Sequence, residues 1–215
     1  MNKQRHYSIV DRLIFQIDHA VRTCFTETPL GERQNPGAHC HETNLSQKEK
    51  SHAAGLMRVN HSGEVAAQAL YRGQALTAHL KQVREAMDQA AEEEKEHLAW
   101  CEQRLKELGS HTSHLDPFWY GGAFLIGAVA GLVGDQWSLG FVAETERQVV
   151  RHLKNHLQRL PEHDKRSAAI LEQMEIDENH HATLAVESGA HELPEFIKQV
   201  MKYCSKVMTT TAYYI

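Results

Sequence analysis

Cysteine and proline are scarce in this sequence of 215 residues, which contains 4 cysteines and 5 prolines. No two cysteines lie at CxxC spacing, so a zinc or redox motif of that kind is not expected. Nothing in their placement indicates a secreted domain held by disulfides. Few prolines interrupt the chain, and no stretch alternates apolar and polar residues as a strand does. We therefore expect an all-α fold.

An excess of basic charge is also missing. The sequence has 23 Lys and Arg against 28 Asp and Glu, a formal net charge of −5, and no long Lys/Arg cluster. This balance gives no support for nucleic-acid binding. A GxGxxG dinucleotide fingerprint is absent. Asp11, Arg12 and Asp18 interrupt the apolar residues near the N-terminus, which is unlike a signal peptide, so we expect a cytosolic, reducing compartment.

The spacing of apolar residues predicts helices along most of the chain. Ser46 and Glu49 form a capping-box signature at the start of the first long helix. The expected organisation is an N-terminal amphipathic helix and loop in residues 1–45, followed by a helical bundle in residues 46–215. Helices are predicted over about 7–25, 46–80, 81–108, from beyond Asp135 to near 161, 163–189 and 194–208, with a loop over 27–44.

One stretch, from Pro117 to Gly134, carries no formal charge and contains five of the 13 glycines. Its length is at the lower limit for a membrane-spanning helix. Three interpretations are open: a buried crossover between the second and third bundle helices, a segment that enters one leaflet or guards a lipid-facing tunnel, and a true span. For the helix over 7–25, packing on the core and lying on a membrane surface are both open.

Two carboxylate-x-x-histidine pairs occur, Glu94 with His97 and Glu178 with His181. Residues three apart lie on one face of a helix, so each pair presents a carboxylate and an imidazole to the same side. This is the ligand motif of metal-binding carboxylate bundles. A single pair is weak support, because 16 histidines are present.

The other two long helices each offer a single glutamate, Glu64 and Glu146, among apolar neighbours. The separation between Glu64 and Glu94 nearly equals the separation between Glu146 and Glu178. The offset from Glu64 to Glu146 likewise nearly equals the offset between the two carboxylate-histidine pairs. The same order of ligands therefore occurs twice, which predicts one metal site built from four helices.

Charge balance indicates which metals fit this site. Four carboxylates contribute four negative charges, and two divalent ions neutralise them. Without cations, four buried glutamates would repel one another and take up protons. Oxygen and nitrogen ligands without thiolate suit iron, manganese or zinc.

Four segments from about residue 50 onward have a distinctive sequence: GLMRVNHSGEVAAQALYRGQ, EEEKEHLAWCEQRLKELGSHTS, PFWYGGAFLIGAVAGLVGDQWSLGFVAETERQV and LEQMEIDENHHA. They resemble the Coq7 family, whose members are demethoxyubiquinol hydroxylases of ubiquinone biosynthesis. The resemblance implies a ferritin-like four-helix bundle with additional N- and C-terminal helices and an apolar Gly-rich crossover. The family's iron ligands fall on Glu64, Glu94, His97, Glu146, Glu178 and His181, and the resemblance assigns the four glutamates a catalytic role as well.

Some positions stay open. Asp177 and His180 make a competing carboxylate-histidine pair, and Glu144 competes with Glu146; the resemblance favours Glu178, His181 and Glu146. His152 matches a histidine that the family places near the metals, although six residues put it about 120° from the Glu146 face of a regular helix. Tyr71, seven residues after Glu64, is expected either to line the substrate cavity or to be a core aromatic.

The resemblance implies O₂-dependent hydroxylation of 2-polyprenyl-3-methyl-6-methoxy-1,4-benzoquinol to its 5-hydroxy derivative. It implies two iron ions per chain, O₂ as co-substrate, and NADH or the quinol itself as reductant. Because a polyprenyl tail is insoluble in water, we expect a peripheral enzyme on the cytoplasmic face of the inner membrane. A homo-oligomer and a ubiquinone-biosynthesis complex are both open. The alternatives are a ferroxidase or iron-storage bundle, a tRNA-modifying di-iron hydroxylase, and a non-catalytic bundle.

Overall fold

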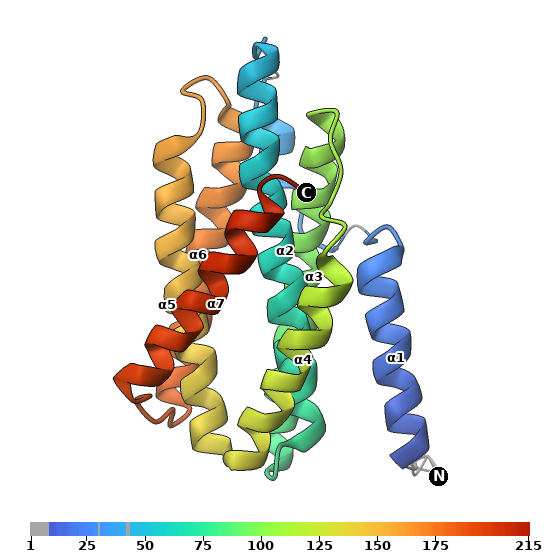
Figure 1. Ribbon diagram of the computed structural model, residues 1–215, viewed down its shortest axis with the longest axis vertical. Coiled ribbons are helices and arrows are strands. Elements are labelled where there is room, and N and C mark those ends of the chain that lie inside the picture. Colours follow the sequence, from blue (N-terminus) through green and yellow to red (C-terminus); the bar gives the residue numbers. More distant parts are fainter. Residues whose placement is uncertain (1–8, 30, 42–43) are drawn as a thin grey trace.

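Seven α-helices and one short 3-10 helix make up the computed structural model, which describes residues 9–29, 31–41 and 44–215 (Figure 1). These described ranges contain no strand, and the all-α prediction is confirmed. Residues 7 and 8 of the first predicted helix lie outside them. The elements are α1 (Ile9–Phe25), η1 (Pro36–His39), α2 (Gln47–Thr77), α3 (Lys81–Glu107), α4 (Asp116–Val133), α5 (Asp135–Arg159), α6 (Lys165–Glu187) and α7 (Glu195–Ala212).

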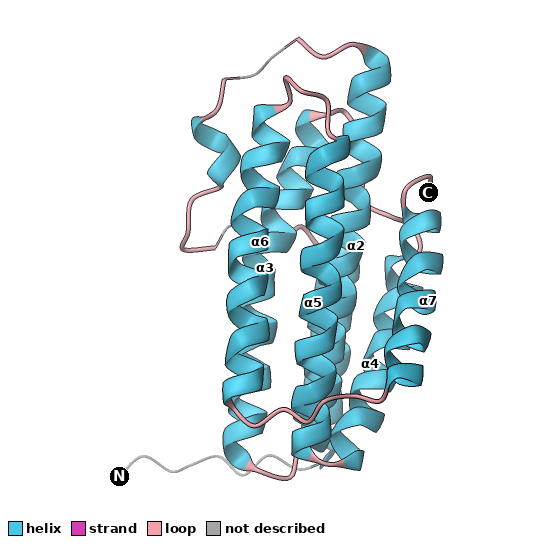
Figure 2. Ribbon diagram, turned by 90° about the vertical axis from the view of Figure 1, so that its left-hand side faces the viewer, coloured by secondary structure: helices cyan, strands magenta, loops and turns pink. Residues whose placement is uncertain are grey.

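Four of the helices, α2, α3, α5 and α6, form the bundle. α2 packs against α3 and α5, and α6 packs against α5 and α3, so the four helices close a ring. In Figure 2 they run side by side along the long axis. α1, α4 and α7 lie outside this ring, and each of them contacts α2. The observed architecture is therefore a ferritin-like bundle with additional helices.

The first bundle helix begins where the sequence predicts. The Ser46 backbone N–H donates to Glu49 Oε2 at 2.8 Å, and the Glu49 backbone N–H donates to Ser46 Oγ at 3.3 Å. These reciprocal bonds satisfy donors that a helix N-terminus leaves unpaired. The start of α2 is thus determined locally, before any packing is considered.

Buried polar side chains on α2 contact every element around it. Gln68, Gln74, Ser62 and Arg58 are all less than 9% exposed, and each is hydrogen-bonded to a different part of the chain. A buried polar group must find such partners, so these bonds determine where the neighbouring helices lie. The partners are Thr23 of α1, Ala91 of α3, Asp116 of α4, Ser138 of α5 and the Tyr213 carbonyl at the end of α7.

Glycines bring α4 directly against α2. A Cβ atom at Gly127 would overlap the Leu70 carbonyl, and one at Gly73 would overlap the Phe124 carbonyl. Such close approach is the reason for small residues at a helix crossing. α4 is a regular crossover helix on the outside of the bundle, with 22% of its residues buried, rather than a buried crossover. Of the described helices, it alone is long and apolar enough to cross a membrane.

The last helix extends beyond the predicted end at residue 208, and that boundary is wrong. α7 continues to Ala212. Thr210 Oγ1 donates to the Lys206 carbonyl at 2.7 Å, and Thr211 Oγ1 donates to the Val207 carbonyl at 2.9 Å. The threonine hydroxyls thus find hydrogen-bond partners on the preceding turn of the helix. The C-terminus therefore reaches the start of α2, where the Tyr213 hydroxyl contacts His52.

Candidate metal centre

All four helices of the bundle contribute a carboxylate at one level of the core. Glu64 comes from α2, Glu94 from α3, Glu146 from α5 and Glu178 from α6, and each is at most 3% exposed. Seven residues along each helix bring the chain back to nearly the same face, two turns away. The residues seven positions before and after each of these glutamates belong to two buried apolar clusters, one on each side of the carboxylates. One cluster includes Met57, Cys101, Leu153 and Leu171, and the other includes Tyr71, Met87, Leu139 and Ala185.

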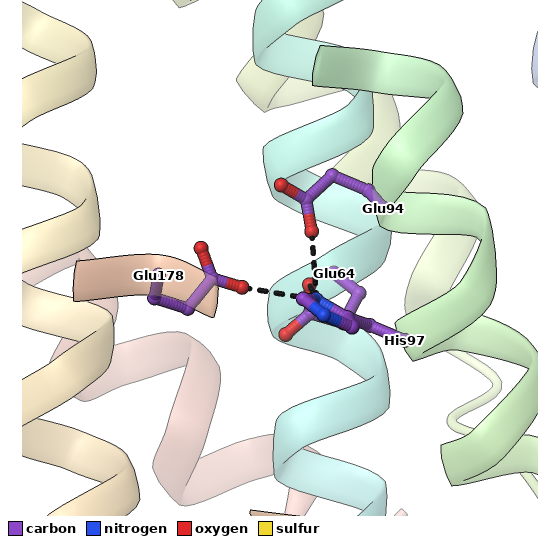
Figure 3. Close-up of side chains that lie close together, drawn as sticks. All are labelled: Glu64, Glu94, His97 and Glu178. Atoms are coloured by element: carbon purple, nitrogen blue, oxygen red, sulfur yellow. Dashed lines mark hydrogen bonds and ion pairs between the residues drawn. The ribbon is translucent and has the colours of Figure 1, made fainter. Parts of the chain in front are cut away.

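His97 lies at the centre of three of these carboxylates. Its Nδ1 atom is 3.0 Å from Glu178 Oε1, 3.1 Å from Glu94 Oε2 and 3.6 Å from Glu64 Oε2. Figure 3 shows the four side chains converging from α2, α3 and α6. One ligand atom from each lies within 4.8 Å of the others, which is close enough for a single ion to be held among them.

His181 makes the same approach from the other side. Its Nδ1 atom lies 3.3 Å from Glu178 Oε2 and 3.4 Å from Glu94 Oε1. Glu94 and Glu178 therefore direct one oxygen toward His97 and the other toward His181. Such an arrangement would allow both carboxylates to be shared between two cations, with Glu64 and Glu146 as further ligands.

Of the four glutamates, Glu146 has the fewest hydrogen-bond partners among the described residues. It is 1% exposed, and neither of its oxygens has a hydrogen-bond donor among the described residues. Burial, together with the charge of Glu178, raises the pKa of Glu146 well above its usual range. Burial likewise raises the pKa of Glu64. Without a cation, burial therefore favours the protonated form of both groups.

The remaining groups of the cluster form charged pairs. Burial alone would lower the pKa of each histidine, but hydrogen bonds to carboxylates raise the pKa of His97 well above its usual range and that of His181 to about 12. Burial opposes ionisation of Glu94 and Glu178, yet their bonds to the histidines lower the pKa of both. Glu94 and Glu178 thus face two histidines whose charged form is favoured.

These residues fit a pair of divalent metal ions. The donors are carboxylate oxygens and imidazole nitrogens without thiolate, a set that suits iron or manganese. Buried polar atoms without a hydrogen-bond partner are costly, and both Glu146 oxygens are of this kind among the described residues. Cations at the centre would satisfy them and replace the protons.

Each histidine is braced by a second carboxylate, which lies on the opposite helix and contacts Nε2, the ring nitrogen that faces away from the cluster. His97 Nε2 lies 2.9 Å from Asp177 Oδ2, and His181 Nε2 lies 3.1 Å from Glu93 Oε2. Asp177 directly precedes Glu178, and Glu93 directly precedes Glu94, so the two braces cross between α3 and α6. Carboxylates in this place orient metal-binding imidazoles. The sequence alone does not predict this role for either residue; its one signal is an acidic residue directly before the glutamate of each carboxylate-x-x-histidine pair.

The alternative ligand candidates offered by the sequence do not lie among the four central glutamates. Asp177 contacts His97 Nε2, the ring nitrogen that faces away from the cluster, whereas His180 is exposed and lines a cavity beside α1. Glu144 accepts hydrogen bonds from Gln148 at 2.8 Å and Arg151 at 3.0 Å on α5. Neither alternative pairing is assembled among the four central glutamates.

His152 and Tyr71 also lie away from the converging carboxylates. The His152 ring contacts the His156 ring, with 4.3 Å between centroids, and lines a cavity between α5 and α7. Tyr71 is fully buried in an apolar cluster, and its hydroxyl has no hydrogen-bond partner in the described part of the chain. Tyr71 is therefore a core aromatic in this structure.

Comparison with known proteins places the chain in a family. The model of the family described as ubiquinone biosynthesis protein COQ7 matches residues 51–212. A relative from Nitrosococcus oceani is 58% identical over 98% of this chain and 99% of its own length. Relatives from Legionella pneumophila (strain Corby) and Pseudomonas fluorescens (strain Pf0-1) are 57% and 55% identical over 98% and 100% of this chain, and over 100% of their own lengths. All three are named 3-demethoxyubiquinol 3-hydroxylase. The chain belongs to the COQ7 family of ubiquinone biosynthesis proteins.

Proposed function

We propose that this chain hydroxylates demethoxyubiquinol, a 2-polyprenyl-3-methyl-6-methoxy-1,4-benzoquinol, to its 5-hydroxy derivative with O₂ and two iron ions. The observation that carries the proposal is the buried cluster in which Glu94 and Glu178 each direct one oxygen to each histidine. The names of the relatives, which match over nearly their whole length, support the substrate.

In this proposal the chain's own residues hold and insulate the reactive centre. Glu94 and Glu178 would be shared by the two metal ions, with Glu64 and Glu146 as further carboxylate ligands and His97 and His181 as nitrogen ligands. Bound iron supplies the electrons that activate O₂ for insertion of one oxygen atom into the ring. The apolar clusters on both sides exclude water, which keeps competing reactions away from the centre. Because the ring gains one oxygen atom and the other leaves as water, an external two-electron donor such as NADH or a quinol is required.

The direct test is a product assay. Iron-loaded protein incubated with O₂, a reductant and a short-chain demethoxyquinol should yield a product heavier by one oxygen atom, and ¹⁸O₂ should label that atom. Mass spectrometry of the quinone fraction measures both. Iron oxidation by O₂ without any change in the quinol would instead support the ferroxidase alternative, which shares the ligand set. The tRNA-modifying alternative stays disfavoured by the net charge of −5.

Membrane attachment is part of the same proposal. α1 and α4 contact each other and expose large apolar side chains. On α1 these include Val10, Ile14, Ile17 and Phe25, exposed by 58–71%; on α4 they include Phe118, Leu125, Val129 and Leu132, exposed by 60–70%. Exposed apolar surface of this extent marks an interaction site. We propose that this α1–α4 face lies on the cytoplasmic surface of the inner membrane and admits the polyprenyl tail, with α4 lying on the bundle rather than spanning the bilayer.

Flotation with liposomes tests the α1–α4 face. The wild-type protein should rise with the vesicles, whereas a Leu125→Glu, Ile126→Glu double variant should stay behind, because charges must be desolvated to enter the interface. A control with the same added charge on exposed positions of α5, Asn155→Glu with Gln158→Glu, should still float. Equal flotation of the Leu125/Ile126 variant and the wild type would remove α4 from the membrane contact.

A further inference from the structure

The segment before α2 lies against the helices that carry the metal-binding histidines. Its residue Arg33 contacts both α3 and α6, although it stands outside the family-matched region 51–212. Arg33 Nη1 lies 2.8 Å from Asp177 Oδ2, and Arg33 Nε is paired with Glu96. The Arg33 backbone N–H also donates to Glu96 Oε1 at 3.0 Å. One side chain therefore connects a loop to two helices of the bundle.

The same guanidinium lies over an aromatic ring that contacts His97. The Arg33 Cζ atom is 5.0 Å from the centroid of the Trp100 ring, and that ring is 5.3 Å from the imidazole of His97. A cation over an aromatic face is attracted to it, so the Trp100 ring stabilises the position of the guanidinium. Trp100 itself is 1% exposed, so its ring is enclosed by neighbouring side chains.

Asp177 is the link between Arg33 and the metal centre. Its Oδ2 atom faces both Arg33 Nη1 at 2.8 Å and His97 Nε2 at 2.9 Å. Its other oxygen accepts a hydrogen bond from Gln173 at 3.0 Å. The carboxylate that orients His97 is thus held from the other side by the arginine.

The opposite half of the site provides an internal comparison. His181 is braced by Glu93, whose other oxygen accepts a hydrogen bond from the neutral side chain of Gln89 at 2.9 Å. The Glu93 side chain is 43% exposed, whereas that of Asp177 is 14% exposed. No Lys or Arg pairs with Glu93 in the described part of the chain. Among the described residues, a basic side chain therefore pairs with the carboxylate behind His97, and none pairs with the carboxylate behind His181.

We propose that Arg33 is a positioning residue for the metal ligand His97, acting through Asp177, so that the N-terminal loop controls one of the two metal positions. The proposal rests on the metal-binding part of the proposed function. The arginine fork suits this role because two different nitrogens hold carboxylates of two different helices. Residues 31–41 would then belong to the metal centre and not only to the surface of the bundle.

Anaerobic titration of the metal-free chain with Co²⁺ tests the proposal, because the absorption bands of the bound ion report ligand geometry without any turnover. Loss of a partner behind a metal-binding histidine costs about 10–100-fold in affinity. We expect Arg33→Ala, one contact further out, to lose about tenfold at one of the two positions. The titration should become biphasic, and Arg33→Lys should recover part of the loss. The matched control is Arg22→Ala, which removes an exposed pair with Asp18 on α1 and should leave both positions unchanged.

A double-mutant cycle distinguishes action through Asp177 from general loosening. If Arg33 acts through Asp177, Arg33→Ala should cost nothing further in an Asp177→Asn background. Full additivity of the two losses, or an Arg33→Ala titration identical to that of Arg22→Ala, would overturn the proposal. Since no reaction is followed, a failure here is separable from a failure of the hydroxylase assay.

Discussion

Replacing Glu178 with alanine should reduce the iron content well below two ions per chain and abolish hydroxylation. Glu178 directs one oxygen toward His97 and the other toward His181, so its loss weakens both metal positions at once. The metal charge would also be under-neutralised in a buried site, which is costly. Iron per chain, determined after anaerobic loading and removal of unbound metal, measures the effect.

A buried glutamate on α5 provides the control for this substitution. Glu144 is 6% exposed but is bonded to Gln148 and Arg151 instead of facing the cluster. Glu144→Gln should therefore keep both irons. If Glu178→Ala kept full iron occupancy, Asp177 and His180 would be the true ligand pair, and the crossed arrangement of braces would have to be reinterpreted.

Loading two divalent ions should release about four protons per chain at neutral pH. In the metal-free cluster, the raised pKa values of Glu64 and Glu146 favour protonated carboxyls, and those of His97 and His181 favour charged imidazoles. Metal ligation requires the deprotonated form of each group, so each must lose its proton. Since binding releases protons, the apparent metal affinity should rise with pH and fall as the solution is acidified.

Calorimetry in buffers of different ionisation enthalpy counts these protons, with Co²⁺ or Mn²⁺ as the ion to avoid oxidation. A Glu146→Gln variant should release about one proton fewer, because burial and the charge of Glu178 keep Glu146 protonated in the metal-free state. Release of no protons would show that the four groups are already deprotonated, and the charge balance assigned to the metal-free cluster would be wrong.

The spacing of the sequence predicted a metal site on four helices because helix periodicity determines which residues share a face. The choice of Glu178 and His181 over Asp177 and His180 depended on the family resemblance. Four glutamates on four helices, in an order that occurs twice with a nearly constant offset, had to meet at one level once the helices paired. The capping box at Ser46 was predictable for the same reason, since it depends on three neighbouring residues.

Contacts between helices were not predictable from local patterns. Glu93 and Asp177 follow the same motif as ordinary surface acids, and only the register of α3 against α6 places them behind the histidines. Arg33 lies in a loop without periodicity, so no pattern relates it to residue 177. The role of residues 117–134 was ambiguous because glycines permit both membrane insertion and close packing. The close packing of Gly127 is against the Leu70 carbonyl of α2, and a contact with another helix cannot be predicted from the local sequence.

The central position of α2 also determines where the chain can tolerate change. From Ala53 to Ala75 nearly every side chain of α2 is buried, and different faces of this one helix contact α1, α3, α4, α5 and α7. A substitution there disturbs two neighbouring helices at once, whereas a substitution on the outer face of α1 or α7 disturbs none. We therefore expect substitutions in α2 to be tolerated less often than substitutions on the outer faces of α1 and α7.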